Sequence, residues 1–344
     1  MNILHIVNGW PDGGILEQVY LLCKHLPKEF KQYSAGFCHF DGNFVKKFEL
    51  AGVPCLQSDE QYSNILDLVA EHKIDIVHKH TGGGDYPEYV DVLYNAKIPL
   101  VETIYCPRKT GIPFEKARYF VYTTPYTLEK NDVSYKEKMI SIQYALDLAK
   151  PIFDSRIHSN DHKLKVGRLC RLVPDKRTDV LLNLAAMSVN GELPVEFHLA
   201  GVIPQDYAHH IEHGDKILKQ IEGFPNITYH GYIENKFDFW KTLDICINPV
   251  WEASFDIVFL EAMACGIPII TWNNSAAPHV VRGAGLVTRP YIYDMFLALV
   301  FMAENPPVRT ELGSNGIEMI KTIYSLENNI NAHIDLYRSV AKEL

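Results

Sequence analysis

The chain lacks the features of several common protein classes. Its seven cysteines are scattered, odd in number and without a C-x-x-C pair, which indicates reduced thiols rather than a disulfide framework. No apolar stretch approaches the roughly 18 residues needed to span a membrane as a helix. The first residues, MNILHIVNGW, do not have the basic segment and long apolar run of a signal peptide. We therefore expect no transmembrane helix, no signal peptide and a cytoplasmic location.

Positive charge is also scarce. The chain has 33 Lys and Arg against 42 Asp and Glu, a formal net charge of −9 at pH 7. This balance argues against a nucleic-acid partner, which usually needs a basic surface. The sequence has no H-E-x-x-H motif, P-loop or nucleophile elbow, and no D-x-D pair that would hold a metal ion against a diphosphate. We therefore expect no metal cofactor.

What the chain does have is material for two domains. It is 344 residues long, with 47% hydrophobic and 22% charged residues. Short apolar runs alternate with amphipathic helical stretches, which is typical of βαβ units on a parallel sheet. The polar stretch DSRIHSNDHK (154–163) interrupts this alternation and is a candidate linker. We expect an α/β fold of two doubly wound domains.

The expected elements follow from this periodicity. The strands are expected at 2–7, 34–40, 74–80, 98–105, 118–124 and 139–145, and then at 164–169, 195–201, 226–233, 244–250, 267–272 and 284–289. The helices are expected at 15–26, 63–73, 177–187, 206–221 and 256–265, and over most of the chain after about 291. Ligands of such sheets bind beyond the carboxyl ends of the strands, so the candidate site residues are sought there.

A glutamate in an apolar helix is the first candidate. Glu261 lies in NPVWEASFDIVFLEAMACGIPII, and a helix over 256–265 would be buried on every side. An unpaired carboxylate there would cost several kcal/mol. Glu261 either pairs with a backbone amide or a cation, or it accepts hydrogen bonds from ligand hydroxyl groups. Ser254 and Asp256 are candidate N-caps, and the N-terminus of a helix attracts anions such as phosphate.

Three cations crowd the junction of a strand and a helix in VGRLCRLVPDKRTDVLL. Each of Arg168, Arg171 and Lys176 alone is most simply a solvated loop cation. Together, at the carboxyl end of a strand, they are typical of a diphosphate clamp, because arginine offers a planar fork and lysine a mobile point charge.

Two weaker signals lie in the first half. Gly13 and Gly14 form a turn after the first strand, where two glycines usually make only a turn but can also let the backbone approach a ligand. His78 and His80 share one strand face, yet no third ligand is evident nearby, so we expect no metal there. We expect His80 at the edge of a cleft with His78 packed beneath it.

Together these motifs resemble the retaining nucleotide-sugar glycosyltransferases of the GT-B fold, in the large family numbered 4 (glycosyl transferases group 1). The resemblance rests on GG at 13–14, DIVHKH at 75–80, RLVPDK at 171–176, HLAG at 198–201, NITYHGYI at 226–233 and, above all, EASFDIVFLEAMACGIPIIT at 252–271. It implies two Rossmann-like domains facing each other across a cleft. The acceptor domain would be 1–157, the donor domain 158–322, and a final helix at 323–344 would cross back to the first domain.

The last motif is similar to the E-x7-E block of that family. The resemblance assigns the nucleotide ribose to Glu261 and the donor sugar to Glu252, which makes Glu252 a catalytic residue. In this chain the two glutamates are one residue too far apart, and the strictly spaced position is Ala253. Either one residue is inserted or the first carboxylate is lost.

The resemblance also assigns the remaining donor-binding residues. The charge of the diphosphate would be neutralised by Arg171 and Lys176, both in the catalytic set, with Arg168 as a second candidate. The base would meet the backbone around Tyr232. Amides of the chain would bind the donor sugar and phosphate at Ser254, Phe255 and Asp256, and the paired glycines, Gly13 and Gly14, would also approach the donor.

On the acceptor side the chain departs from the family pattern. Where the family often has a histidine, this chain has Tyr105, so we assign the acceptor side to His80 and Tyr105. The usual acidic residue of a G-G-x-x-E turn is replaced by His279.

The resemblance implies transfer of a sugar from a UDP or GDP sugar, with retention and without metal, to a hydroxyl group of a glycan or lipid-linked acceptor. This is an activity of polysaccharide biosynthesis. The departures leave one alternative, a catalytically inactive nucleotide-sugar-binding partner subunit, and a less favoured one, a nucleotide-sugar epimerase. The basic and aromatic stretch RKTGIPFEKARYF (108–120) adds the hypothesis of peripheral contact with the inner face of a membrane.

Overall fold

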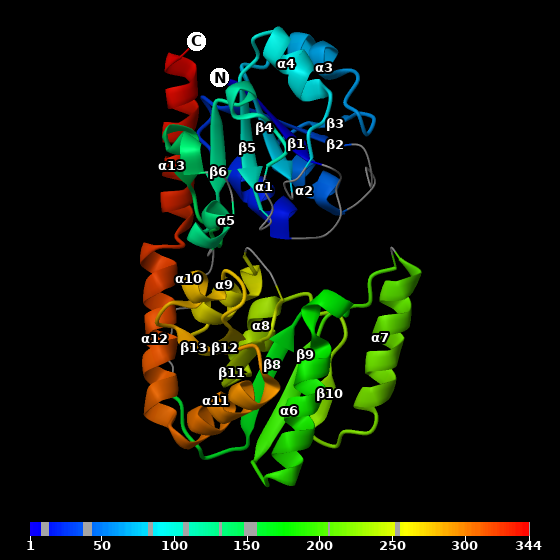
Figure 1. Cartoon of the computed structure of the whole chain (residues 1–344), viewed down its shortest axis with the longest axis vertical. Coiled ribbons are helices and arrows are strands. Elements are labelled where there is room, and N and C mark those ends of the chain that lie inside the picture. The colour runs from blue at the N-terminus through cyan, green and yellow to red at the C-terminus, as the bar shows by residue number, and fades with distance from the viewer. Residues whose placement is uncertain are drawn as a thin grey trace. The chain divides into compact units, whose positions relative to one another are not determined.

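The computed structural model of the chain describes residues 1–7, 14–36, 43–81, 85–105, 110–130, 133–147, 157–205, 207–251 and 255–343. The chain folds into two compact α/β units. Unit 1 comprises Met1–Asp147 and Tyr324–Leu344, and unit 2 comprises Leu148–Ile323 (Figure 1). Among the described residues, no helix is long and apolar enough to cross a membrane.

Unit 1 is built on a seven-stranded sheet in the order β3-β2-β1-β4-β5-β6-β7, in which every pairing is parallel. The strands are β1 (Asn2–Val7), β2 (Lys31–Gly36), β3 (Cys55–Gln57), β4 (Ile76–Thr81), β5 (Leu100–Ile104), β6 (Tyr119–Tyr122) and β7 (Met139–Ser141). The helices are α1 (Gly14–His25), α2 (Asn43–Leu50), α3 (Ile65–His72), α4 (Tyr89–Asn95), α5 (Pro125–Glu129) and α13 (Leu326–Lys342), with short 3-10 helices η1 (Phe114–Lys116) and η2 (Val133–Lys138).

Alternate residues of the strands of unit 1 enter different cores. Leu4 and Ile6 of β1 pack in a cluster with residues of α3 and α4. Ile3 precedes Leu4 and faces the opposite side of the sheet, where it packs with Leu22 of α1 and with α13. Helices therefore cover both faces of the sheet, which explains why consecutive residues of β1 and β2 are buried.

Helix α13 comes from the far end of the sequence and completes unit 1. It begins at Ser325, whose side chain accepts a hydrogen bond from the amide of Asn328. Its residues Leu336, Tyr337 and Val340 are buried against the sheet of unit 1. The last helix therefore belongs to the unit that also contains the start of the chain.

Unit 2 is built on a six-stranded parallel sheet in the order β10-β9-β8-β11-β12-β13. The strands are β8 (Leu164–Leu169), β9 (Val195–Ala200), β10 (Ile227–Tyr229), β11 (Ile245–Asn248), β12 (Ile269–Trp272) and β13 (Gly285–Thr288). The helices are α6 (Thr178–Asn190), α7 (Ala208–Ile221), α8 (Lys236–Lys241), α9 (Ile257–Ala264), α10 (Ala277–Val281), α11 (Ile292–Glu304) and α12 (Pro306–Thr322), and η3 (Pro174–Lys176) is a 3-10 turn.

The predicted fold class is confirmed, because the chain forms two Rossmann-like doubly wound sheets. Each predicted strand corresponds to an observed one, although β3 was missed and residues 37–40 of the second prediction lie outside the described part of the chain. The described part of the predicted linker is mostly exposed, but one of its residues is anchored in unit 2. His158 is buried, and its amide donates to the hydroxyl group of Thr310.

Candidate functional site

The candidate site of unit 2 lies at the carboxyl ends of β8 and β11. These two strands are neighbours in the sheet, and the chain leaves β8 toward β9 on one side and β11 toward β12 on the other. The order of the strands therefore reverses between them. In open α/β sheets this reversal is the point where ligands bind, because the loops that follow the two strands diverge.

The three predicted cations lie at different depths around this point. Arg168, near the end of β8, is completely buried, and its Nη1 donates to the carbonyl oxygen of Arg177 at 3.1 Å. Its Nε and Nη2 atoms have no hydrogen-bond partner among the described residues. Arg171 is exposed, and Lys176 ends the 3-10 turn η3 with a side chain that is 20% exposed. The structure therefore brings only Arg171 and Lys176 to the surface.

Lys176 contacts a carboxylate of the opposite loop. Its Nζ lies 3.3 Å from Oδ2 of Asp256, and the side-chain amide of Asn248 donates to the same oxygen at 3.1 Å. Asp256 is the N-cap residue of α9, as predicted, but its side chain makes no capping hydrogen bond. The carboxylate of Asp256 instead joins the start of α9 to η3 and to the end of β11.

Glu261 is buried in the middle of α9, and its partner is a cation. Its Oε1 accepts from Nζ of Lys236 at 3.0 Å, and its Oε2 accepts from the indole Nε1 of Trp240 at 3.4 Å. Burial raises the pKa of the Glu261 carboxyl, and the charge of Lys236 opposes this rise. The sequence left two interpretations of Glu261, a pair with a cation and a contact with ligand hydroxyl groups. The structure contains the pair with a cation. The carboxylate still has lone pairs that could accept from ligand hydroxyl groups.

Sequence reasoning missed both partners of Glu261. Lys236 and Trp240 lie four residues apart on α8, which packs against α9. Side chains at this spacing share one face of a helix, so a lysine and a tryptophan there could have been recognised as a pair that faces one neighbour. Lys236 is half exposed, whereas Trp240 is fully buried.

The loops after β9 and β10 approach the same edge of the sheet. Gly201 has φ of +135°, and a Cβ atom there would lie 1.8 Å from the carbonyl oxygen of Cys170. Its amide donates to the carbonyl oxygen of Gly231 at 2.8 Å, which joins the two loops. The side chain of Tyr232, the predicted base contact, follows and is 73% exposed.

An aromatic corner near the end of β12 was also missed. The guanidinium group of Arg177 lies over the ring of Trp272, 5.4 Å from its centroid, and is held in a bidentate pair by Asp179. Trp251 meets Trp272 edge to face at 6.0 Å and is 46% exposed. Trp272 itself is buried, so the exposed ring of this corner is Trp251, which is three residues before Ser254 in the sequence.

Several predicted residues lie outside the described part of the chain, namely Glu252, Ser254 and Gly13, together with Ala253. Phe255 is half-buried just before α9, and Gly14 is the first residue of α1. The two interpretations of Glu252, an inserted residue or a lost first carboxylate, therefore both stand as the sequence left them.

His80 and Tyr105, the predicted acceptor-side residues of unit 1, are both buried. Nδ1 of His80 lies 3.0 Å from the hydroxyl group of Tyr105, and its Nε2 lies 2.9 Å from Nδ1 of His5. His80 was expected at the edge of a cleft; in the structure its ring is 2% exposed, and both of its ring nitrogens contact neighbours of the same unit. A direct role in acceptor binding stays a prediction.

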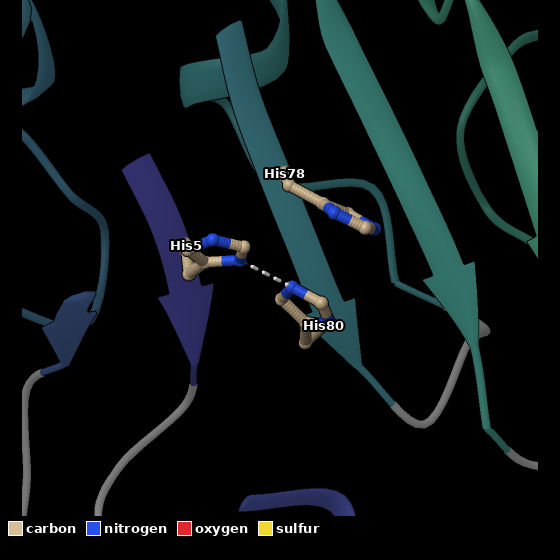
Figure 2. Close-up of side chains that lie close together, drawn as sticks. All are labelled: His5, His78 and His80. Atoms are coloured by element: carbon tan, nitrogen blue, oxygen red, sulfur yellow. Dashed lines mark hydrogen bonds between the residues drawn. The ribbon is translucent and has the colours of Figure 1, made fainter. Parts of the chain in front are cut away.

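His5 of β1 joins His78 and His80 of β4 in a histidine cluster (Figure 2). Nitrogen atoms of the three rings lie within 4.8 Å of one another, close enough to hold a metal ion. Sequence analysis did not identify this third histidine. Nδ1 and Nε2 of His78, however, contact the hydroxyl groups of Tyr337 and Thr103, both at 2.7 Å.

The hydrogen bonds of this cluster fix the state of its rings. The side-chain amide nitrogen of Gln32 donates to the carbonyl oxygen of Phe30. Oε1 of Gln32 therefore faces Nε2 of His5 and accepts a hydrogen bond from it at 2.6 Å. Nδ1 of His5 then accepts from His80, whose Nδ1 accepts from Tyr105. These contacts need no more than one proton on His5 and one on His80, and burial lowers the pKa of all three rings, that of His5 to about 4. A metal ion would have to displace these bonds, so the cluster is best described as a neutral core network.

Residues 108–120 are the stretch predicted to contact a membrane. The basic residues of this stretch that the structure describes contact carboxylates of the same chain. Lys116 forms an ion pair with Asp91, and Arg118 lies 3.9 Å from Glu343. Phe120 of the same stretch is fully buried. Membrane contact through this stretch stays a prediction.

Comparisons with known proteins agree with this fold. Residues 163–300 match the profile of the family described as Glycosyl transferases group 1. The poly(ribitol-phosphate) alpha-N-acetylglucosaminyltransferase of Staphylococcus aureus (strain COL) is 24% identical over 180 residues, which are 51% of this chain and 35% of that protein. The chain thus matches only about a third of the length of this curated relative.

Solved structures extend the similarity to the whole chain. A glycosyltransferase from Rickettsia africae ESF-5 has a TM-score of 0.79 and 14% identity, and the alignment covers 100% of this chain and 99% of that one. Anabaena Alr3699/HepE, in complex with UDP and glucose, has a TM-score of 0.76 and 16% identity, with coverage of 98% and 100%. The predicted resemblance to glycosyltransferases of the GT-B fold is confirmed.

Proposed function

We propose that this chain is a glycosyltransferase that moves a sugar from a nucleotide diphosphate sugar, of the UDP or GDP type, to a hydroxyl group of a glycan or lipid-linked acceptor. The observation that carries this proposal is the contact of Lys176 with Asp256 at the point where the strand order of unit 2 reverses. Both residues lie in the segment that matches the glycosyltransferase family. Retention of the anomeric configuration and independence of metal ions are parts of the same proposal.

In this proposal the diphosphate of the donor binds at the surface cations. Lys176 would exchange its contact with Asp256 for a phosphate oxygen, and the exposed Arg171 would reach the same group. The N-terminus of α9 adds the partial positive charge of a helix end. The predicted ribose contact of Glu261 uses carboxylate lone pairs that Lys236 and Trp240 leave open.

The chemistry requires stabilisation of the leaving diphosphate. Negative charge develops on its oxygen as the bond to the sugar breaks, and the ammonium group of Lys176 is placed to oppose this charge. These protein cations would replace the metal ion that a D-x-D pair holds in other transferases. A departing oxygen on the same face can accept the proton of the acceptor hydroxyl group, so the proposal needs no protein nucleophile.

The first test substitutes Lys176. We expect Lys176→Ala to lower turnover by about 100- to 1000-fold, the typical loss when one group that stabilises developing charge is removed. Lys163→Ala is the matched control, because Lys163 is 67% exposed and pairs with Glu196 away from this edge. Both variants should keep the circular dichroism spectrum of the wild type. Near-normal transfer by Lys176→Ala would overturn the assignment of the diphosphate.

The second test identifies the reaction. UDP and GDP sugars are offered with glycan acceptors, starting with N-acetylglucosamine donors and ribitol phosphate polymers because of the relative's name. The anomeric configuration of the product is determined by nuclear magnetic resonance, and the reaction is repeated with a chelator. An inverted product or loss of activity with the chelator would refute retention or metal independence, respectively.

The inactive-subunit alternative makes a different prediction in the same assay. Calorimetry would show binding of a nucleotide sugar, while no acceptor in the panel and no water would receive the sugar. Ala253 at the strictly spaced position of the E-x7-E block motivates this alternative. Turnover with any acceptor would eliminate it.

A further inference from the structure

Helix α11 carries an exposed apolar row. Tyr293, Leu297 and Phe301 are 62%, 49% and 46% exposed and follow one another at intervals of four residues. The opposite side of the same helix, with Met295 and Leu299, is fully buried in the core of unit 2. Side chains four residues apart share one face of a helix, so the row is continuous.

Such a row differs from the usual surface of a globular protein. Single exposed apolar side chains are common, whereas contiguous apolar patches generally mark a surface that contacts another molecule. The row is extended at the N-terminal end of α11 by Tyr291, which is 61% exposed. The helix is thus apolar on both its buried and its exposed faces.

We propose that this row is the contact surface between two copies of the chain, with the two α11 helices antiparallel about a twofold axis at Leu297. Tyr293 and Phe301 each lie four residues from Leu297, so the row is symmetric about its centre. A twofold axis there would place Leu297 against its own counterpart and Tyr293 against the partner's Phe301. A twofold interface requires a surface that complements itself in this way.

The charges at the ends of the row support the same arrangement. Arg289 precedes α11 and Glu304 ends it, at nearly equal distances in sequence from Leu297. The antiparallel arrangement brings Arg289 near the partner's Glu304. Arg289 forms an ion pair with Asp294 of its own chain. Its side chain is still 72% exposed, and its guanidinium group can donate to a second carboxylate.

The same charges argue against a lipid surface as the partner. From Arg289 to Glu304 the chain has one basic residue, Arg289, and two acidic residues, Asp294 and Glu304. Anionic membranes attract clusters of lysine and arginine, which this row lacks. A second copy therefore matches the row better than a bilayer does.

The area of the row predicts a weak dimer. Four exposed side chains of this kind would bury roughly 400 Å² per copy, about half of the roughly 800 Å² per partner that is typical of stable complexes. We therefore expect a dimer that forms with increasing protein concentration, in the micromolar range or above, rather than a permanent one.

Sedimentation velocity over a range of concentrations tests the dimer. We expect Leu297→Asp to raise the dissociation constant at least about tenfold, because it places two carboxylates together on the axis. Leu66→Asp is the matched control, since Leu66 of α3 has a similar exposure of 44% but belongs to unit 1, whereas α11 belongs to unit 2. The control should dissociate at the same concentration as the wild type.

Charge complementation tests the twofold axis itself. Leu297→Lys alone should also be monomeric, whereas a mixture of Leu297→Lys and Leu297→Asp should form a heterodimer. A wild type that stays monomeric up to near-millimolar concentration would overturn the proposal, and so would a mixture that fails to associate. If the wild type stays monomeric and cosediments with neutral phospholipid vesicles in a Leu297-dependent manner, the row is instead a lipid-binding face.

Discussion

A buried ion pair in unit 1 allows a quantitative test of the structure. Lys79 of β4 and Glu102 of β5 stand opposite each other in the sheet and are both fully buried. Nζ of Lys79 lies 2.8 Å from Oε1 of Glu102 and 3.1 Å from a carboxylate oxygen of Asp85. The second oxygen of Glu102 accepts a hydrogen bond from Thr110. The pair thus holds two residues, Asp85 and Thr110, that follow the carboxyl ends of β4 and β5.

The perturbation is Lys79→Met, which preserves most of the side-chain volume and removes the charge. At 2.8 Å and an effective dielectric constant of about 20, the attraction between the two charges is roughly 6 kcal/mol. The cost of removing both charges from water offsets much of it, at several kcal/mol for each ion. The intact pair therefore contributes little net stability, whereas the single variant leaves Glu102 buried without its partner and should destabilise unit 1 by about 3–5 kcal/mol.

Two companion variants isolate the effect of burial. Lys24→Met breaks an ion pair with Asp147 of the same 2.8 Å length, but these side chains are 38% and 21% exposed, so we expect a loss of about 1 kcal/mol or less. The double variant Lys79→Met, Glu102→Leu removes both buried charges, and we expect most of the lost stability to return.

Hydrogen exchange followed by mass spectrometry is the suitable assay, because it resolves the two units. Exchange of amides in β4 and β5 reports the free energy of opening of unit 1, and peptides from β8 and β11 serve as the internal control. A loss below about 1 kcal/mol for Lys79→Met would refute the reasoning that Glu102 is left as an uncompensated buried charge. Equal losses for Lys79→Met and Lys24→Met would show that burial does not determine the cost.

Three further predictions concern pH, the partner of Glu261 and a close helix contact. The histidine cluster of unit 1 has lowered pKa values in the folded state, so the unfolded chain binds more protons below about pH 6.5. We expect the stability of unit 1 to fall from about pH 6.5 toward pH 4, by up to about 1.4 kcal/mol per pH unit for each histidine, in urea titrations followed by circular dichroism. Lys236→Met should cost about 1–2 kcal/mol and raise the pKa of Glu261 further, so that stability measured by tryptophan fluorescence decreases as the pH rises above about 5. Gly313→Ala should lower the melting temperature, because the new Cβ would lie 2.2 Å from the carbonyl oxygen of Gly266, whereas Gly283→Ala meets nothing nearer than 3.8 Å and should be almost neutral.

Each of these predictions has an outcome that contradicts it. Stability of unit 1 that is constant between pH 7 and pH 5 would show that the histidine cluster is not neutral and buried. The pH dependence of Lys236→Met should disappear when Glu261 is also replaced by glutamine, and its persistence would point to another group. If Gly313→Ala melts at the same temperature as Gly283→Ala, α12 and α9 are not as close as the structure shows.

The strands were predictable because their apolar runs are buried on both faces of parallel sheets. The alternation of these runs with amphipathic stretches was enough to predict two doubly wound units. The edge strand β3 was missed because Cys55–Gln57 is only three residues long and only partly buried, so it carries no apolar run. The short helix α8 was missed for a similar reason, since Lys236–Lys241 is little longer than one turn.

The site was predictable only where local sequence determines it. Arg168 and Lys176 were grouped because one lies near the end of a strand and the other soon after it. Spacing does not reveal that Arg168 is fully buried while the side chain of Lys176 is partly exposed. The partner of Glu261 depends on the packing of α8 against α9. His5 could join the histidine cluster only because β1 is the neighbour of β4, and periodicity does not give the order of strands in a sheet.

Three lysine–carboxylate pairs in this chain differ in how deeply they are buried and in the distance between their charged atoms. The Lys79 and Glu102 pair is closed to solvent at 2.8 Å, and Lys236 meets the buried Glu261 at 3.0 Å. The contact of Lys176 is the longest of the three, at 3.3 Å, and Asn248 shares the same oxygen of Asp256.

Both side chains of that third pair are partly exposed, at 20% and 11%. A single carboxylate is a weaker partner than a diphosphate, which brings more charge and more acceptor oxygens to the ammonium group. In the proposed function, Asp256 therefore keeps Lys176 oriented toward the end of α9 until a donor replaces it. In the same proposal, Glu261 would keep its contact with Lys236 and would accept hydrogen bonds from the ribose with its remaining lone pairs.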